Sequence, residues 1–555
     1  MERIWLKSYP PGVAAEIDYK GYRSLGELFE KSVAQYRDRD AFHSMGKTIT
    51  FGELDGLTHN FAAWLQSKGL GKGARVAIMM PNCLQYPVVM FGALRAGYTI
   101  VNVNPLYTAR ELEHQLKDSG AEVIVILENF ASTLEQVLPR VPLKHVVVAA
   151  LGDLLGVKGL LVNFVLRNVK KMVPAFELPG ARRFNDVLRE GAGKPLKPFE
   201  VGHEDIAFLQ YTGGTTGVSK GAMLLHRNIL ANIHQSEAWL LPSLKGEVAV
   251  IITALPLYHI FSLTVNCLLM LKVGGCNILI TNPRDIPGFV KELAKHKYNI
   301  ITGVNTLFNA LMNNPEFAKL DFSALKSAVG GGMAVQKAVA DKWRQMTGKP
   351  LQEGYGLTET SPSATMNPPY IEAYNGSIGL PLPSTEVAIR NDARQDVKQG
   401  EAGEICIRGP QVMKGYWQRP DETAKVLGAD GFLYTGDIGV MDDKGFVTIV
   451  DRKKDMILVS GFNVYPNEIE QVVAMHPGVL ECAAIGVPDE HSGEVPKVFV
   501  VKRDPNLTEQ DVLEHCKKEL TGYKRPRSVE FRTELPKTNV GKILRRALRD
   551  EKKAA

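Results

Sequence analysis

The sequence predicts an α/β protein in which a large N-terminal domain is followed by a small C-terminal one. A chain of 555 residues is too long for a single hydrophobic core. Short apolar runs at 76–80, 98–103 and 123–127 alternate with segments of helical periodicity, which is typical of a mostly parallel sheet with helices on its faces. Five consecutive charged residues at 451–455 interrupt this pattern and mark a domain boundary.

Each domain has its own expected elements. The large domain, 1–450, should combine parallel-rich βα subdomains with a β-barrel-like part whose last hairpin spans 440–450. Residues 451–455 form the expected linker between the two domains. In the small α+β domain, 456–555, we expect a strand at 456–460, a helix at 467–475, strands at 481–487 and 497–501, and a helix that begins near Thr508.

The composition is that of an ordinary globular enzyme, with 45% hydrophobic and 23% charged residues. The first twelve residues mix charges with two prolines and so do not resemble a signal peptide, and no apolar run reaches the length of a membrane-spanning helix. The six cysteines are scattered without a C-x-x-C pair, so they indicate neither a zinc site nor a disulfide framework. We expect a cytoplasmic protein with no nucleic-acid partner, and a homodimer stays open.

The positive charge is concentrated at the C-terminus. From Thr521 onward there are eleven Lys/Arg against four Asp/Glu, a net charge of +7, whereas the whole chain carries +6. This basic excess indicates either contact with an acidic ligand or surface, or a solvated end. For residues 550–555 alone we favour the solvated end.

Residues 160–173 form a predicted basic amphipathic helix. Its leucines, valines and methionine share one face, and Asn163, Arg167, Lys170 and Lys171 lie opposite. The commoner interpretation is a surface helix that packs its apolar stripe on the core. The alternative is a helix that lies in a membrane interface and attaches the protein peripherally to the inner membrane.

The most informative motif runs from Tyr211 to Gly221 and combines glycines, hydroxyl side chains and one lysine after the apolar run 206–209. Glycines let backbone amides turn toward an anion, hydroxyls donate to it, and a lysine adds positive charge, so the motif predicts a polyphosphate site. Gly, not Ser or Thr, follows the lysine, which disfavours an ordinary P-loop NTPase. A flexible linker is the weaker alternative. The candidate phosphate-binding residues are Tyr211, Thr212, Gly213, Gly214, Thr215, Thr216, Gly217 and Lys220.

A second motif, 352–359, follows the glycine triplet 330–332. Glycines on both sides of Tyr355 allow close approach to its ring, which suits a nucleobase, although such a turn is more often only a tight loop. Thr358 and Glu359 offer a hydroxyl and a carboxylate for a phosphate oxygen and a cation such as Mg²⁺.

A third motif presents Asp437 on a glycine turn, with Arg452 after the following hairpin. A carboxylate can accept from two sugar hydroxyls, and a guanidinium can donate to the sugar or to phosphate. The plainer alternatives are a turn-capping aspartate and a solvated linker arginine.

Together these motifs resemble those of the adenylate-forming superfamily of acyl-CoA synthetases, luciferases and peptide-synthetase adenylation domains. The same order continues through the Asp-Arg-Lys-Lys-Asp linker to Pro-Lys-Thr-Asn-Val-Gly-Lys at 536–542. The segment 430–439 is similar to the signature of fatty acyl-CoA synthetases, and the blocks 254–261 and 301–311 are similar to bacterial long-chain fatty acyl-CoA ligases of β-oxidation.

The resemblance implies two half-reactions with ATP, Mg²⁺ and coenzyme A: a carboxylate forms an acyl-adenylate, and the coenzyme A thiol then displaces AMP. Lys542 would be the adenylation lysine, with one more charge in a basic tail as the alternative. The small domain would be mobile and rotate after the adenylate forms. Its hinge linker would be 451–455, with Lys454 as the hinge residue, because a solvated charged segment can change its dihedral angles at little packing cost. The implied nucleotide contacts are Thr212 and Glu359 at Mg²⁺, Tyr355 and Gly356 with Gly331 and Gly332 at adenine, Thr358 at the α-phosphate, and Asp437 and Arg452 at the ribose.

The acyl site is implied next to His259, which by itself would be an ordinary core histidine. By the resemblance it orients the carboxylate or gates coenzyme A. The candidate walls carry no fixed charge, so a medium to long apolar acid is the expected substrate. Rival functions are transfer to a carrier protein or luciferase-like oxidation, an ATP hydrolase or switch, and a non-catalytic acyl-binding module. The wall residues are Ile260, Phe261, Val304, Leu307 and Phe308.

Overall fold

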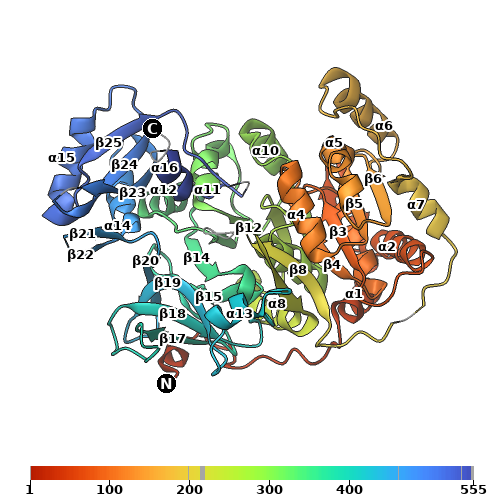
Figure 1. Cartoon of the computed structure of the whole chain (residues 1–555), viewed down its shortest axis with the longest axis horizontal. Helices are drawn as coiled ribbons and strands as arrows, with labels where there is room; N and C mark the ends of the chain where they lie inside the picture. The colour runs from red at the N-terminus through yellow and green to blue at the C-terminus, as the bar shows by residue number, and fades with distance from the viewer. Residues whose placement is uncertain are drawn as a thin grey trace.

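A computed structural model describes residues 2–197, 199–212, 219–460, 462–489, 491–538 and 540–551. Two large sheets make up most of the N-terminal region, a small antiparallel sheet follows, and a separate C-terminal sheet stands at one end of the molecule (Figure 1).

The first large sheet has seven strands in the order β7-β6-β5-β3-β4-β8-β9, and every pair is parallel except β8 and β9. Its central strands are continuous apolar runs because both faces are covered; all five residues of β5 are buried. The strands are β3 (Arg75–Met79), β4 (Thr99–Asn102), β5 (Val123–Leu127), β6 (His145–Ala149), β7 (Arg182–Arg183), β8 (Ile206–Thr212) and β9 (Lys220–Leu225).

The second large sheet has nine strands in the order β16-β15-β14-β13-β12-β10-β11-β1-β2. From β14 to β1 neighbours are parallel, and the strands added at each end are antiparallel. The strands are β1 (Asp40–Ser44), β2 (Lys47–Thr50), β10 (Val250–Thr253), β11 (Cys276–Leu279), β12 (Ile300–Gly303), β13 (Ser327–Gly330), β14 (Leu351–Gly356), β15 (Ser363–Met366) and β16 (Leu380–Pro381).

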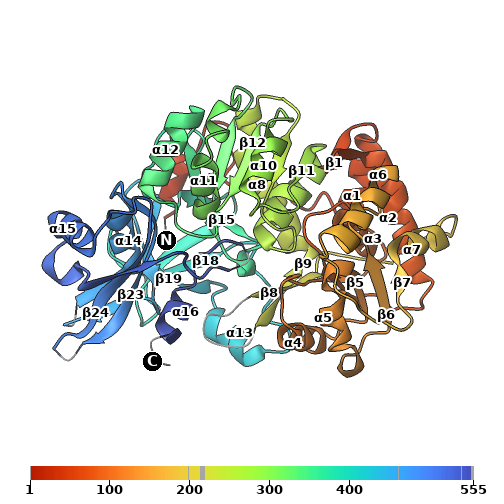
Figure 2. The ribbon, with the colours of Figure 1, turned by 90° about the horizontal axis from the view of Figure 1, so that it is seen from above.

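Helices cover both faces of the seven-stranded sheet, with α1 to α3 on one face and α4 and α5 on the other (Figure 2). Helix α4 begins at Ala109, where a capping box between Thr108 and Glu111 satisfies the free amides. The helices of the large region are α1 (Leu25–Gln35), α2 (Phe51–Gln66), α3 (Gln85–Arg95), α4 (Ala109–Ser119), α5 (Ala131–Glu135), α6 (Val157–Phe164), α7 (Phe184–Gly191), α8 (His226–Leu240), α9 (Leu269–Val273), α10 (Ile286–Leu293), α11 (Asn305–Met312), α12 (Lys337–Thr347) and α13 (Pro420–Val426).

The predicted barrel-like part is a four-stranded antiparallel sheet in the order β17-β18-β19-β20. The predicted hairpin is present, since β19 pairs with β20 across the turn after Met441. A bridge between Gly379 and Val447 connects this sheet with the end of the nine-stranded one. The strands are β17 (Glu386–Arg390), β18 (Gly403–Arg408), β19 (Leu433–Met441) and β20 (Val447–Arg452).

The C-terminal region has a five-stranded sheet and its own buried clusters. The predicted helix at 467–475 is observed one residue earlier, and the next helix begins after its cap, Thr508. All six cysteines of the chain are buried and unpaired. The elements are β21 (Ile457–Val459), β22 (Phe462–Val464), α14 (Pro466–Ala474), β23 (Val479–Asp489), β24 (Gly493–Lys502), α15 (Glu509–Glu519), β25 (Ser528–Arg532) and α16 (Arg545–Asp550).

The amphipathic segment is helical, as α6 and a π-helical turn at Val165–Val169. Two of its polar residues contact the protein: Asn163 accepts from the Gly152 amide at 2.8 Å, and Arg167 pairs with Glu128 at 2.8 Å. Of the apolar stripe, Val162 packs on the core but Leu161 and Val169 are exposed, so the expected packing on the core is only partly present. The apolar residues most exposed here are Val157, Leu160, Leu161, Phe164, Val169 and Met172.

Within the described residues, the helices are all too short or too polar to cross a membrane.

Candidate active site

A cavity of about 1030 Å³ lies where the carboxyl ends of β12, β13 and β14 meet the C-terminal region. These strand ends contribute Val304, Gly331 and Tyr355, and the C-terminal region contributes Lys542. The carboxyl edge of a parallel sheet is where α/β proteins bind their ligands. The volume is sufficient for a nucleotide or a comparably large ligand.

The predicted phosphate motif begins in β8 and ends in β9. The predicted residues Gly213, Gly214, Thr215, Thr216 and Gly217 lie outside the described residues. Thr212 and Lys220 are directly paired across the two strands, and both line the cavity.

The charge of Lys220 is held by an acid at this rim. Its Nζ lies 2.7 Å from Oε2 of Glu422 and 4.7 Å from the ring centre of Tyr416. The Tyr416 hydroxyl in turn donates to Oε1 of Glu359 at 2.6 Å. The lysine and the predicted metal-binding carboxylate therefore belong to one connected network.

Tyr211 also lines the cavity, but its hydroxyl is directed to a structural partner. It donates to Oδ2 of Asp118 at 2.7 Å, and Arg419 pairs with the other oxygen of that carboxylate at 2.5 Å. The ring packs on Gly221, where an added Cβ would lie 3.0 Å from it. Tyr211 thus fixes the base of the motif.

Three residues predicted from separate motifs form a single cluster. The Tyr355 hydroxyl donates to Oδ2 of Asp437 at 2.6 Å, and Nε of Arg452 lies 3.3 Å from Oδ1. Asp437 and Arg452 are paired across β19 and β20, so the sheet itself places them together. Burial, with the charge of Asp437, raises the pKa of Tyr355 well above its ordinary value, which keeps the phenol protonated.

Two of the predicted glycines are required by close backbone contacts. An added Cβ on Gly356 would lie 1.9 Å from the carbonyl oxygen of Pro362, within the β14–β15 hairpin. Gly332 has a φ of +76°, in the left-handed region that favours glycine. Gly331 and Gly332 both line the cavity.

Thr358 and Glu359 lie in a short 3₁₀ helix that follows β14, and both line the cavity. Thr212 and Glu359 supply a hydroxyl and a carboxylate, the oxygen donors that Mg²⁺ prefers, and Tyr416 uses one of the two carboxylate oxygens. Mg²⁺ is commonly held by one or two protein oxygens together with substrate phosphates, so these residues fit that ion.

Lys542 reaches the cavity from a tight turn. The Thr538 amide donates to its carbonyl at 2.7 Å, and its own amide donates to the Thr538 hydroxyl at 3.0 Å. Gly541, with a φ of +84°, accepts from the Thr306 hydroxyl at 3.0 Å and thereby attaches the turn to α11. Burial, and then the charge of Arg452, lower the pKa of Lys542 to about 7.

The linker at 451–455 is not the solvated segment expected from its charges: Asp451 is fully buried in β20, and the linker is tied to the segment that follows Lys542. Arg545 contacts Glu470 at 2.7 Å, Asp451 at 3.2 Å and Asp455 at 3.5 Å. Lys454 lines the cavity, and burial, with the charge of Arg452, lowers its pKa to about 8.

His259 lines the cavity, and burial, with the charge of Lys542, lowers its pKa to about 4. Its ring is therefore neutral at pH 7. Its Nδ1 accepts from the Phe261 amide at 3.4 Å.

The predicted acyl walls are only partly present. Ile260, Phe261 and Val304 line the cavity, whereas Leu307 and Phe308 pack in the core behind it. Phe308 is fully buried, with its ring 4.8 Å from that of Trp343. On α11 the residues that line the cavity are instead polar: Asn305, Thr306 and Asn309.

Further lining residues carry no sequence signal. Many are apolar side chains that look like core residues until the fold places them on a wall, and Leu240 follows the helical period of α8 as its buried neighbours do. Glu353 also lines the cavity, but it is charged and not apolar. Burial raises the pKa of its carboxyl to about 8, and nothing in the sequence indicates that burial. The lining residues not predicted include Ser236, Leu240, Leu255, Val265, Met366, Ile378 and Leu382.

Comparison with known proteins decides the family. Residues 29–417 match the model of the AMP-binding enzyme, and residues 468–542 match that of the AMP-binding enzyme C-terminal domain. The chain belongs to the AMP-binding enzyme family. The resemblance to adenylate-forming enzymes is confirmed.

Several AMP-binding enzymes match this chain from end to end. A long-chain-fatty-acid–CoA ligase of Yersinia pestis is 60% identical, and one of Escherichia coli O157:H7 is 59% identical; each match covers 99% of this chain and 98% of the relative. The crystal structure of the anthranilate CoA ligase AuaEII in complex with anthranoyl-AMP covers 97% of this chain and 99% of its own, with a TM-score of 0.86 and 25% identity. The predicted mixed α/β architecture is thus also confirmed.

Proposed function

We propose that this AMP-binding enzyme is an ATP-dependent long-chain fatty acyl-CoA ligase. The observation that carries the proposal is the 60% identity, over 99% of the chain, to a long-chain-fatty-acid–CoA ligase. A cavity shared between the large region and the C-terminal region, with Lys542 inside it, supports the two-step chemistry of such an enzyme.

In the first step, a carboxylate oxygen of the fatty acid attacks the α-phosphorus of ATP. A phosphorus–oxygen bond to the acyl group forms, the bond to the β-phosphate breaks, and pyrophosphate leaves. In the second step, the sulfur of coenzyme A attacks the acyl carbonyl, the thiol proton is released, and AMP leaves.

Lys542 promotes the first step because it lies between two anions that must meet. Its ammonium group stabilises the negative charge shared by the carboxylate and the α-phosphate. The tight turn that carries it limits its freedom, so little entropy is lost on binding. His259, which is neutral at pH 7, orients the carboxylate or gates the entry of coenzyme A without adding charge.

The nucleotide binds against the cluster of Tyr355, Asp437 and Arg452. Tyr355 contacts adenine beside Gly331, and Asp437 accepts from the ribose hydroxyls. Arg452 neutralises that aspartate from 3.3 Å. Thr358 contacts the α-phosphate.

Thr212 and Glu359 would hold Mg²⁺, which when bound offsets the negative charge of the phosphates. Lys220 holds the departing pyrophosphate. Because Glu422 lies 2.7 Å from its ammonium group, the phosphates must displace this carboxylate, and Lys220 then exchanges one anion for another.

The apolar walls select the acid. Each methylene that leaves water contributes about 0.8 kcal/mol, so along an open tunnel affinity rises steeply with chain length. Residues on α8 and near β15, such as Leu240 and Met366, extend the apolar lining beyond the predicted walls. We therefore place the acyl chain between α8 and the nine-stranded sheet.

A panel of saturated fatty acids tests the substrate, with AMP and pyrophosphate measured with and without coenzyme A. AMP release that needs coenzyme A and is greatest for medium to long chains is expected. Transfer of the acyl group to a carrier protein in place of coenzyme A would favour the rival function, and ADP with phosphate as products would contradict the proposal.

The hinge lies at 451–455, with Lys454 as the residue whose backbone rotates between the two steps. The five-stranded sheet and its own cores from 456 onward make that region able to move as a unit. Replacing Lys454 by proline should therefore slow the second half-reaction more than the first, and equal slowing of both would argue against this hinge.

We also propose that α6 docks on an anionic membrane surface. Leu161 and Phe164, which are 64% and 57% exposed, stand outward, while Asn163 and Arg167 attach the other side of the helix to the protein. The exposed Lys170 and Lys171 follow about two turns later, and anionic lipid attracts such charges. Contiguous exposed apolar side chains generally mark a surface that binds a partner or a membrane.

Flotation with liposomes that contain anionic lipid tests the docking. The double variant Leu161→Glu with Phe164→Glu should lose binding, and Val248→Glu, at a residue 51% exposed elsewhere, should retain it. Wild-type protein that stays unbound with both neutral and anionic lipid would refute the proposal. Light scattering on the same protein tests the homodimer.

A further inference from the structure

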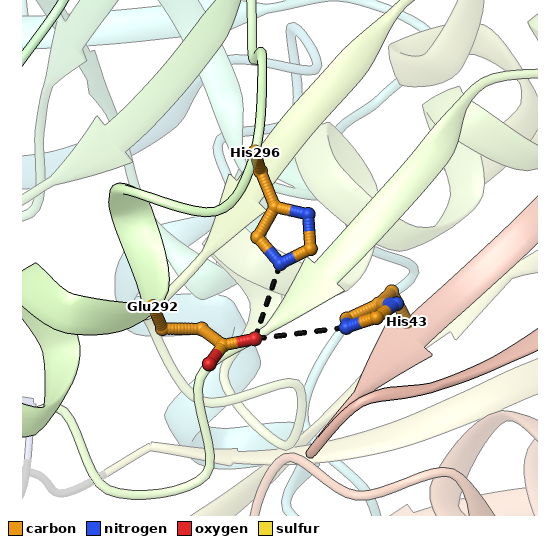
Figure 3. Close-up of side chains that lie close together, drawn as sticks. All are labelled: His43, Glu292 and His296. Carbon is orange, nitrogen blue, oxygen red and sulfur yellow. Dashed lines mark hydrogen bonds and ion pairs between the residues drawn. The ribbon is translucent and has the colours of Figure 1, made fainter.

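Two histidines and a glutamate from distant parts of the chain converge at one edge of the nine-stranded sheet (Figure 3). His43 comes from β1, Glu292 from α10, and His296 from the loop that follows α10. Oε1 of Glu292 lies 3.1 Å from Nε2 of His296 and 3.6 Å from Nε2 of His43. The three atoms all lie within 4.8 Å of one another.

The ring of His43 is held in an orientation that a metal ligand requires. Its Nδ1 lies 2.8 Å from the Thr48 hydroxyl, whereas its Nε2 is buried and has no hydrogen-bond partner among the described residues. Metal-binding histidines generally use the second ring nitrogen for such a hydrogen bond, which fixes the ring and the tautomer. A buried polar atom without a partner is costly unless something occupies the space in front of it.

We propose that His43, Glu292 and His296 bind one Zn²⁺ ion, with solvent completing its coordination. A tetrahedral ion with bonds of about 2.0–2.1 Å places its ligand atoms roughly 3.4 Å apart. The two separations from Glu292, 3.1 Å and 3.6 Å, lie on either side of that value. Two imidazoles and one carboxylate suit zinc better than Mg²⁺ or Ca²⁺, which prefer oxygen ligands.

One cation already lies beside this cluster. Nζ of Lys295 is 2.6 Å from Oε2 of Glu292, the carboxylate oxygen that is not directed at the histidines. The Lys295 side chain is 63% exposed, so it can move away when an ion binds. Lys295 and a zinc ion would contact different oxygens of the Glu292 carboxylate. The positive charge of Lys295 would therefore weaken zinc binding without blocking it.

This zinc site is separate from the proposed Mg²⁺ site. Of the described residues that line the active-site cavity, none belongs to the zinc cluster. An ion here would connect β1, near the start of the chain, with α10 and the following loop, which lie about 250 residues later. Its expected role is to fasten β1 to the edge of the sheet, where β1 pairs with β11.

Calorimetric titration of Zn²⁺ into the untagged, metal-stripped full chain tests the proposal. We expect one ion per chain, and affinity at least tenfold weaker in His43→Gln and in His296→Gln. His476→Gln is the matched control, because His476 and His515 form a similar ring pair, 5.3 Å apart, whose nitrogens contact the Gly478 amide and the Val472 carbonyl. The affinity of the His476→Gln variant for zinc should equal that of the wild type.

Lys295→Gln keeps the test decisive if a histidine variant fails to fold. Removing this exposed cation should strengthen zinc binding, whereas a site elsewhere on the chain would not respond. Co²⁺ should also give the visible absorption of a tetrahedral site with nitrogen ligands in wild type and in Lys295→Gln. Unchanged affinity in both histidine variants, or no zinc bound by the wild type, would overturn the proposal.

Discussion

The pH dependence of adenylation depends most directly on Lys542. Burial and the nearby Arg452 lower its pKa to about 7, from an ordinary value of about 10.4. At about 1.4 kcal/mol for each pKa unit, the ammonium form in the free enzyme costs roughly 4–5 kcal/mol more than in water. Catalysis needs this ammonium form. With a pKa of about 7, only about one free enzyme molecule in ten carries it at pH 8.

The profile of kcat/KM against pH reports the free enzyme, whereas that of kcat reports the enzyme with its substrates bound. Pyrophosphate release should therefore show kcat/KM falling about tenfold per pH unit above pH 7. Once ATP and the fatty acid are bound, their negative charges raise the pKa of Lys542, so kcat should stay level to a higher pH.

Lys542→Arg keeps its charge at every pH, so its kcat/KM should lose this alkaline decline even if its rate is lower. Lys542→Ala should lower adenylate formation by about 10²–10³ while ATP still binds. Lys537→Ala, which removes an exposed lysine that pairs with Glu481 on the same turn, is the control and should keep the wild-type profile. A wild-type kcat/KM that stays flat from pH 6.5 to 9, or normal adenylation by Lys542→Ala, would refute the reasoning.

Three further outcomes are expected. Tyr355→Phe removes the hydroxyl that donates to Asp437. The KM for ATP should rise by about tenfold, because a hydrogen bond to a charged group is worth about 1.5 kcal/mol or more, and kcat should change less. An unchanged KM would show that this cluster does not bind the nucleotide. The carboxyl of Glu353 has a folded-state pKa of about 8, above its unfolded value, so its contribution to stability is complete below about pH 4 and is lost as pH rises to 8. Glu353→Gln should remove that decline, by up to about 5 kcal/mol, and an identical pH dependence in urea unfolding would contradict the assignment. Arg545→Met leaves Glu470 without its bidentate partner and should destabilise the C-terminal region by about 3–5 kcal/mol, whereas a change of under 1 kcal/mol in hydrogen exchange there would show that the pair is dispensable.

The sheets, and the residues that meet around Asp437, could be predicted because their signals are local. A parallel strand covered on both faces is a continuous apolar run, and β5 shows this at all five positions. Asp437 and Arg452 are a more indirect case: each lies in a short motif, but their contact follows from the pairing of β19 with β20.

The acyl walls could not be predicted in the same way. Phe308 satisfied the requirement for an apolar side chain near the site, yet its position on α11 turns it toward Trp343. Leu240 and Val265 line the cavity, but a leucine that faces a cavity and one that faces the core have the same sequence pattern. The distinction depends on which helix face the rest of the fold covers.

The same limit explains the orientation of α6. Periodicity separates its two faces, but contacts made elsewhere choose which face is covered. Gly152 and Gly159 approach so closely that an added Cβ on Gly159 would lie 1.9 Å from the Gly152 carbonyl oxygen, and Glu128 draws in Arg167. The three zinc ligands are a further case, since histidines that are far apart in sequence carry no spacing signal.

The attachment of the C-terminal region has the strength that a two-step reaction needs. Contacts with α11 include the bond from Thr306 to Gly541 and that from Asn309 to the Leu480 carbonyl, each worth about 0.5–1.5 kcal/mol. Such polar contacts can be exchanged for water, unlike a buried apolar interface. A lysine with a lowered pKa is drawn into the cavity most strongly while carboxylate and triphosphate are both present. When pyrophosphate leaves, that attraction weakens, so in the proposed reaction the loss of pyrophosphate favours release of Lys542 and entry of coenzyme A.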